Sequence, residues 1–418
     1  MRNSIIFILL FIGLTTQSQT ITLSVCLDST MVNYPLSKQA EINNRILQTD
    51  LQRISNTNLP QVDFTGKATW QSEVMELPIT IPGMDIPDIN KDQYKAQLEI
   101  NQALYKGGLT KAQKQLSQST NAISNAEMEV SLNNVKHSVI MIYYQILLTK
   151  DYIKVSKTYV STLESKLGEM SAQIEAGVLL PTMAEVIKAE KLTIEQKILE
   201  LEMNLSSLIK QMEQYTGISI SPTTEFAFPK VDVNFSLAQK RPEYQLMELS
   251  QQKMDAMKTL TTAQYMPKAF AFSTLGYGRP GFNYLSNDFA PYAMVGVGFN
   301  WPIWNWGAAK KQKDILDFNK GLVEVQKETF ILELNTKLIE LKSEIEKQQK
   351  MLKKAQEIVT LRKSVAETTD NQLKNGIVTP SRYIDELQKY EKAKLEVQIY
   401  KIKLSIAQTN YLWALGRL

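Results

Sequence analysis

The chain repeats itself at a constant spacing of 199 residues, and this repetition limits the folds open to it. Asn101–Gly108 begins a long polar stretch, and a similar segment, Asn300–Gly307, begins another. The same offset carries further turn-forming residues onto one another: Gly177 onto Gly376, Pro181 onto Pro380, and Gly217 onto Gly416. An offset held from residue 101 to residue 217 predicts two tandem copies of one structural unit.

Each predicted copy contains two alternating strands, a very long helix, a Gly-x-x-x-Pro turn and a second helix. Residues 109–176 contain no proline, and a helix of that length would extend roughly 100 Å at ~1.5 Å per residue. A compact globule does not need such a helix, whereas a membrane barrel joined to a helical tube does. The predicted boundaries are a lead-in at 19–58, repeat 1 at 59–217 (β-hairpin 60–104, helical hairpin 109–217), a connecting segment at 218–266, and repeat 2 at 267–418 (β-hairpin 267–303, helical hairpin 307–416).

Residues 1–18 are typical of a secretory signal peptide. Arg2 precedes the apolar run Ile5–Leu14, and small residues follow at Thr16 and Ser18. The apolar run is too short to span a bilayer as a helix; the alternative is a buried N-terminal helix. No other segment approaches 18 apolar residues, so we expect an exported chain that crosses a membrane to do so with strands.

Strict alternation marks the strands. The apolar residues Tyr94, Ala96, Leu98 and Ile100 alternate with the polar residues Lys95, Gln97, Glu99 and Asn101, and the 199-residue offset carries the apolar set onto Ala293, Val295, Val297 and Phe299. Period two with one apolar and one polar face is the signature of a half-buried strand, and about ten residues suffice to cross a bilayer. We therefore predict that Tyr94, Ala96, Leu98, Ile100, Val295, Val297 and Phe299 face lipid, and that Lys95, Gln97, Glu99 and Asn101 line a lumen.

Two features of the strand region stay open. The third strand, near residues 269–277, is apolar on both faces, so its register cannot be fixed from the sequence. Aromatic residues gather at the strand ends, among them Trp70, Tyr277, Trp301 and Trp304. Membrane barrels carry aromatic girdles at such positions; the alternative is the core of an ordinary sandwich.

The helical stretches follow a heptad pattern. Val135, Val139, Ile142 and Ile146 start a series that steps by three and four through the long helix, and Ile140 lies on a second apolar row. A sustained 3.5-residue period predicts left-handed coiled-coil packing. A helix with two apolar rows packs on both sides, as in a wall of helices.

Four strands per chain leave two open edges, and unpaired backbone groups in lipid are very unfavourable. Closure must then be oligomeric. Two chains would give eight strands, a barrel filled by its own side chains, whereas three would give twelve strands with room for a passage. The sequence therefore predicts a homotrimer.

Composition argues against several function classes. The 47 basic and 43 acidic residues are well mixed, so no nucleic-acid surface is expected. Cys26 and His137 are the only residues of their types, which argues against a disulfide scaffold, a metal site and a catalytic triad. We expect no cofactor and regard an enzyme as the least favoured class.

The chain resembles the TolC-like outer-membrane efflux protein family (the outer membrane factors). The resemblance covers most of the chain and is carried by Ile21–Asp28, Gln102–Gly108, Trp301–Gly307 and the two Gly turns. It implies a mixed α/β membrane protein, in which three subunits form a 12-stranded outer-membrane barrel on a periplasmic tunnel of coiled-coil helices. It also implies export with a periplasmic adaptor and an inner-membrane pump of the RND or ABC class.

Sites follow from this resemblance. Both helix reversals should fall at one tip, far from the strands, where they would meet the adaptor: Gly177, Leu179, Pro181, Gly376, Val378 and Pro380. The family often has an acidic residue six positions past the tip Gly, but here Met183 and Arg382 stand there. Asp385 does match an acidic family position, and Glu185, Glu190 and Glu386 are neighbours that could substitute. Asp385, Glu185 and Arg382 are therefore the gate candidates; the alternative is a solvated helix face.

Two other classes stay open at this stage. A periplasmic adaptor also has a long helical hairpin, but one hairpin rather than two in tandem. A coiled-coil filament would explain the heptads but neither the strands nor the leader. The sequence does not identify the cargo, the class of pump, or whether the resting tip is closed.

Overall fold

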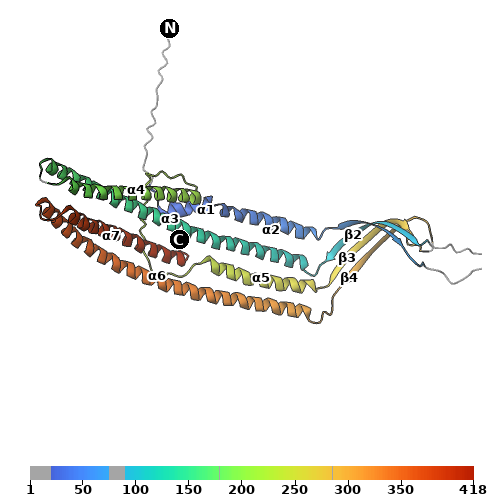
Figure 1. The fold of residues 1–418 in the computed structure, drawn as a ribbon. Coiled ribbons are helices and arrows are strands. Elements are labelled where there is room, and N and C mark those ends of the chain that lie inside the picture. The colour runs from blue at the N-terminus through green and yellow to red at the C-terminus, as the bar shows by residue number, and fades with distance from the viewer. Residues whose placement is uncertain (1–19, 75–89, 178, 285) are drawn as a thin grey trace, which may run out of the picture. The chain divides into compact units, whose positions relative to one another are not determined.

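The computed structural model describes residues 20–74, 90–177, 179–284 and 286–418 (Figure 1). The elements in chain order are α1 (Leu23–Asn33), a short 3-10 helix (Pro35–Lys38), α2 (Gln39–Asn56), β1 (Gln61–Trp70), β2 (Asp92–Tyr105), α3 (Leu109–Glu175), α4 (Pro181–Thr216), α5 (Pro242–Gln264), β3 (Lys268–Arg279), β4 (Ala290–Asn300), α6 (Ala308–Lys374) and α7 (Pro380–Ala414). The predicted leader at residues 1–18 lies outside the described residues.

The two long helices have the same length and the same spacing as the sequence repeat. Both α3 and α6 contain 67 residues, and their bounds differ by 199 positions at each end. The helix α5 precedes β3 as α2 precedes β1. The predicted connecting segment 218–266 therefore contains a helix that corresponds in order to part of the lead-in.

The chain forms two compact units, and each unit draws on both halves of the sequence. The first unit comprises residues 1–37, 130–241 and 331–418, and the second comprises 38–129 and 242–330. The long helices α3 and α6 each contribute to both units. The compact units therefore cut across the sequence repeats, because residues from the two halves pack against each other.

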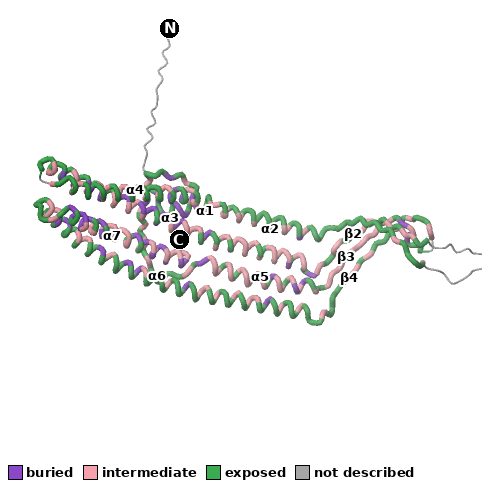
Figure 2. The backbone as a smooth tube through the Cα atoms, in the orientation of Figure 1, coloured by how far each residue is buried: buried purple, intermediate pink, exposed green. Residues whose placement is uncertain are grey.

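The first unit holds the apolar cores. One core cluster surrounds Tyr143 and Tyr144, and a second contains Tyr159, Leu163 and Tyr383; buried stretches of α3, α4 and α7 are visible in Figure 2. The tyrosines of the first cluster do not leave their hydroxyls unsatisfied. The Tyr144 hydroxyl lies 2.6 Å from Thr409 Oγ1 and 2.7 Å from Ser405 Oγ. A buried phenol hydroxyl requires hydrogen-bond partners of this kind.

The N-terminal segment is held in this core. Ile21 forms a parallel bridge with Phe226, in which the Ile21 N–H donates to Glu225 O over 2.9 Å. The Tyr143 hydroxyl lies 2.9 Å from Ile21 O. Cys26 is fully buried on α1, and burial raises its pKa to about 12. Cys26 is therefore a packing residue of this core.

The second unit contains one antiparallel sheet with the strand order β1-β2-β3-β4. The register of β3, which the sequence left open, aligns Leu275 with Leu98 on one side and with Ala293 on the other. Three glycines of the sheet have no room for a side chain because aromatic rings lie against them. A Cβ at Gly298 would lie 2.3 Å from Phe270, and the pairs Gly296–Phe272 and Gly276–Tyr292 are similarly close.

Among the described residues, the helices are all too polar over any 18-residue window to cross a membrane.

Candidate functional site

The register assembles one apolar face across the whole sheet. Tyr94, Ala96, Leu98 and Ile100 of β2 lie on the same face as Val295, Val297 and Phe299 of β4, and Val62, Phe64, Ala68 and Trp70 of β1 join them. In the single chain most of these side chains are exposed, whereas Leu98 and Ile100 are half-buried; Val295, for example, is 83% exposed. A soluble monomer rarely exposes an apolar surface of this extent, so the face requires an apolar partner.

The opposite face of β1 and β2 is polar. Lys95, Gln97, Glu99 and Asn101 all lie on it, as does Thr65. The side chains form a network: Tyr292 donates from its hydroxyl to Gln97 Oε1 over 3.0 Å, and Gln97 in turn donates to Glu99. The two predicted sets of strand residues therefore occupy two opposite faces of one sheet.

Aromatic rings and a cation gather at the loop end of the sheet. Tyr277 and Phe289 stack with their ring centroids 5.8 Å apart. The guanidinium of Arg279 lies over the Phe289 ring at 5.3 Å and over the Tyr94 ring at 5.6 Å, and it forms an ion pair with Asp92. Amphipathic rings at a strand end are typical of the boundary between lipid and water.

In the first unit, two turns reverse the helical hairpins. Gly177 and Gly376 have φ angles of 73° and 70°, in the left-handed region that glycine adopts most readily. Pro181 and Pro380 begin the following helices, where a missing N–H costs nothing. Leu179 packs against the core cluster that contains Tyr383. The turn residues predicted for adaptor docking thus come together in one unit; Val378 is half-buried and Pro380 is buried.

The gate candidates lie in different surroundings. Asp385 is half-buried, and its carboxylate accepts a hydrogen bond from Lys389 over 2.7 Å, which holds its pKa below the usual value. Arg382 is exposed and lies 3.1 Å from Glu386, whose side chain is buried. Glu185 is exposed on α4. The acidic side chain that the structure encloses is therefore Glu386 rather than Asp385.

The structure also contains a buried ion pair that the sequence analysis missed. The Lys166 ammonium on α3 lies 2.6 Å from Asp370 on α6 and 2.6 Å from Glu169. It also lies over the ring of Tyr383 on α7, 5.3 Å from the centroid. Lys166 is 5% exposed. One lysine thus joins three helices of the unit, including both helical hairpins.

The electrostatics of this pair favour its charged form. Burial acts to raise the pKa of Asp370, but hydrogen bonds from Lys166 and Lys374 outweigh it, and the pKa is lowered from 3.8. Burial likewise acts to lower the pKa of Lys166, and the hydrogen bonds to Asp370 and Glu169 outweigh that effect. The ion pair is therefore intact at neutral pH.

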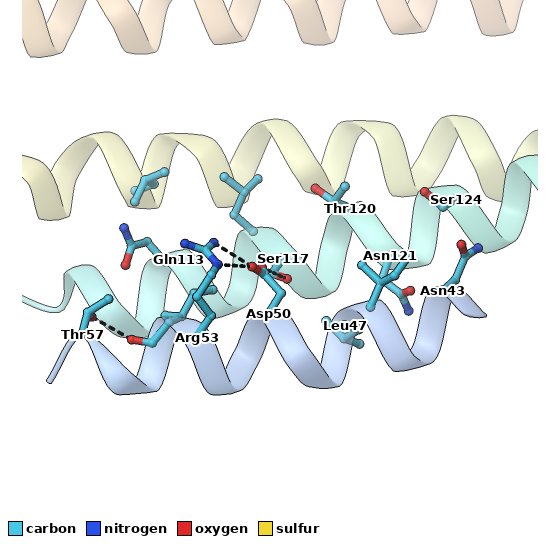
Figure 3. Close-up of a pocket in the computed structure, with 14 residues that line it drawn as sticks. Asn43, Leu47, Asp50, Arg53, Thr57, Gln113, Ser117, Thr120, Asn121 and Ser124 are labelled. Atoms are coloured by element: carbon cyan, nitrogen blue, oxygen red, sulfur yellow. Dashed lines mark hydrogen bonds and ion pairs between the residues drawn. The ribbon is translucent and has the colours of Figure 1, made fainter. Parts of the chain in front are cut away.

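The second unit has a groove of about 480 Å³ between α2 and α3 (Figure 3). Figure 3 shows Asp50 and Arg53 of α2 facing Ser117 of α3. Asp50 accepts from Ser117 Oγ over 2.7 Å and from Arg53, and these hydrogen bonds lower the Asp50 pKa. The lining residues contain amides and hydroxyls but no histidine or cysteine. The groove therefore offers hydroxyl, amide and carboxylate groups for hydrogen bonding.

Within the ranges that the structure describes, no three His, Cys, Asp or Glu side chains are grouped to hold a metal ion. His137 lies against Trp413, with ring centroids 4.3 Å apart. Its surroundings are those of a helix-packing residue.

Comparisons with known proteins find a family match over part of the chain and a shared fold over most of it. The family described as outer membrane efflux protein matches residues 33–215. No curated protein matches the chain significantly.

Three solved structures illustrate the likeness of fold. The Campylobacter jejuni CmeC outer membrane channel has a TM-score of 0.66 and 15% identity, covering 94% of this chain and 85% of that chain. The outer membrane protein VceC from Vibrio cholerae has a TM-score of 0.67 and 12% identity, with 94% and 96% covered. The open state of the Neisseria gonorrhoeae MtrE outer membrane channel has a TM-score of 0.66 and 12% identity, with 94% and 88% covered. The predicted combination of long helices and a four-stranded antiparallel sheet is confirmed.

The buried ion pair between α3 and α6 leads to a first prediction. We expect Asp370→Asn to lower the stability of the first unit by about 1–3 kcal/mol, because Lys166 stays buried with less charge compensation. The measurement is thermal unfolding of the purified protein, followed by circular dichroism. Lys166→Met combined with Asp370→Leu should recover much of the loss, since no unpaired charge is then buried.

The same pair has a defined pH dependence. Because the pKa of Asp370 is lowered in the folded state, its contribution is complete above 3.8 and is lost as the pH falls through the lowered value. The difference in melting temperature between wild type and Asp370→Asn should therefore persist from pH 7 to pH 5. A difference that disappears already at pH 5 would contradict the assignment.

Proposed function

We propose that this chain forms the outer-membrane exit channel of a multicomponent export system, and the match of residues 33–215 to the outer membrane efflux protein family supports this. The single observation that carries the proposal is the sheet. It has an apolar face that spans all four strands and an opposite face that is polar on β1 and β2, and among the described residues its two edges have no partner strand. Such a sheet is suited to lipid on one side and water on the other once its edges are closed.

The proposed channel does no chemistry. Its substrates would be moved by a pump in the inner membrane, of the RND or ABC class, through a periplasmic adaptor. The helices would form a periplasmic tunnel, and the residues at the two turns, Gly177, Leu179, Pro181, Gly376, Val378 and Pro380, would meet the adaptor. The alternative, that the chain is itself the adaptor, is disfavoured because it has two helical hairpins and a sheet with an apolar face.

We further propose a homotrimer built from tandem repeats. In the second unit, α2 precedes the edge strand β1 and α6 follows the opposite edge strand β4. Both helices expose apolar rows: Ile42 and Ile46 on α2, and Ile315, Phe318, Leu322 and Val325 on α6. The spacing of the α6 row is that of a coiled-coil seam. The apolar row on α2 of one subunit would pack on the apolar row on α6 of its neighbour. The sheet edges of the two subunits, β1 and β4, would pair at the same interface.

The proposed gate lies among the helices near the turns. Loosening there would separate the two hairpins, which the Lys166–Asp370 ion pair joins. Asp385, Glu185 and Arg382 remain proposed gate residues, and Glu386 joins them because its buried carboxylate lies 3.4 Å from Arg362 on α6.

The export function is tested by a susceptibility panel of drugs, dyes and metal salts on a deletion strain of the host. Restored resistance to at least one class, when the gene is returned, is the expected result, because export would again be complete. The same panel would identify the cargo. Unchanged susceptibility to every compound, with the protein present in the outer membrane, would argue against efflux.

The face assignment is tested by one arginine on each face of the sheet. Val297→Arg should cost about 2–4 kcal/mol, because it places a charge at mid-bilayer on the lipid side. Trimer levels in the outer membrane should then fall. Gln97→Arg is the matched control on the opposite face and should be tolerated. Equal trimer levels for the two variants would show that the faces are assigned wrongly.

The subunit interface is tested on α6. Phe318→Asp with Leu322→Asp should prevent trimer formation, because two carboxylates would be buried without partners. The mass of the detergent-solubilised protein, measured by light scattering, reports the assembly. Gln312→Asp, exposed on the same helix but off the apolar row, should leave the trimer intact. A trimer that survives the double substitution would place the interface elsewhere.

A further inference from the structure

The sheet register sets like charges directly opposite each other at two separate levels of the polar face. Asp63 of β1 pairs with Glu99 of β2, and Lys67 of β1 pairs with Lys95 of β2. Like charges directly opposite each other destabilise an antiparallel pair. The stability of the sheet therefore does not account for this arrangement.

The two levels are too far apart to neutralise each other. Asp63 and Lys67 are four residues apart on one strand, which is about 13 Å in extended chain. That distance exceeds the reach of an ion pair and the screening length of about 8 Å at physiological salt. Within the described residues, none of the four side chains takes part in an ion pair. Each level therefore presents its own charge to the solvent.

Neutral groups hold the charges in place and separate the levels. Glu99 accepts hydrogen bonds from the Gln97 amide and, over 3.5 Å, from the Thr65 hydroxyl. Gln97 and Thr65 are themselves opposite each other, in the row between the acidic and the basic pair. The Lys95 ammonium lies over the ring of Tyr284, 5.7 Å from its centroid. These contacts position the side chains of Glu99 and Lys95 without cancelling their charge.

The direction of the chain orders the two levels. β1 follows α2 and runs toward the loop that joins it to β2. Asp63 is thus nearer the helices, and Lys67 is nearer the loop end. In the proposed channel the helices are periplasmic, so the acidic level would be the inner one and the basic level the outer one.

We propose that Asp63 with Glu99, and Lys67 with Lys95, form two oppositely charged levels of the channel lumen that make ion passage asymmetric. The inference rests on the proposed function, because three subunits are needed to bring six carboxylates to one level and six ammonium groups to the other. The inner level concentrates cations, and the outer level raises the barrier to cations that enter from the loop end. A passive pore cannot drive net flow by this means, so the asymmetry shows only under an applied voltage or gradient.

The experiment is a planar-bilayer recording of the purified trimer, added from one side so that it inserts in one orientation. The wild type should carry unequal currents at equal and opposite voltages. Lys67→Gln with Lys95→Gln should bring the two currents toward equality and raise the ratio of cation to anion permeability at least about twofold. Asp63→Asn with Glu99→Gln should move the permeability ratio in the opposite direction. All four replacements nearly preserve side-chain size, and trimer mass confirms assembly.

A lysine elsewhere on the same face is the matched control. Lys268 stands opposite the uncharged Asn300 at the helix end of β3. Lys268→Gln should leave the inequality of the two currents in place. Equal currents in the wild type, or a permeability ratio unchanged in the Lys67/Lys95 variant, would overturn the inference and leave the channel function standing. Trimers that insert but carry no current would overturn the proposed function instead.

Discussion

The unpaired edges of the sheet are the constraint on which the rest of the structure depends. β1 and β4 each have a neighbour on one side only, and their outer N–H and C=O groups need partners wherever water is excluded. In the proposed channel the apolar face would exclude water, because lipid is the environment that suits the exposed side chains of Val295, Val297 and Phe64. The helices next to those edges expose apolar rows as well. Backbone hydrogen bonding and side-chain packing therefore both require a neighbour at the same two edges, and a second copy of the chain offers both.

The first unit relies on a different balance of forces. Apolar clusters hold each part of it, but the contact between the hairpins near the turns includes a buried charged pair, Lys166 and Asp370. Separating an apolar seam exposes hydrocarbon to water, whereas separating an ion pair returns two charges to a solvent that hydrates them well. A seam that contains such a pair is easier to part than an apolar seam of equal size. This property suits a bundle that opens at the turns better than one that stays permanently closed.

A structural feature could be predicted from the sequence when it depends on neighbouring residues, and could not when it depends on distant ones. The long helices and the strand β2 follow from periods of 3.5 and two residues, which neighbouring residues determine. The register of β3 does not, because Phe270 and Phe272 lie on one face while Leu275 and Tyr277 lie on the other. Only its pairing with β2 and β4 fixes which face is which. Pairs of residues far apart in the sequence could not be predicted for the same reason.

Lys166 is one lysine among many on a long helix, and its partner lies 204 positions away. The opposition of Lys67 and Lys95 likewise appears only when the hairpin register is known. The compact units could not be drawn from the repeat either, since each unit contains segments of both copies. Contacts between distant parts of the chain decide all three features, and no local pattern records them.

The two β-hairpins differ mainly on one face, and this difference bears on the wall of the proposed channel. At the 199-residue offset, Ala96, Leu98 and Ile100 correspond to the apolar residues Val295, Val297 and Phe299. On the polar face, Lys95, Gln97 and Glu99 correspond instead to Met294, Gly296 and Gly298. Positions that face lipid need apolar side chains, whereas positions that face a lumen can hold charged, amide or aromatic side chains or glycine. On this face the first hairpin thus supplies most of the charges, and the second supplies Lys268 together with aromatic rings over glycine. In a threefold assembly these two kinds of surface would alternate around the lumen, which gives a duplicated chain more chemical variety on its inner wall than a strictly symmetric one.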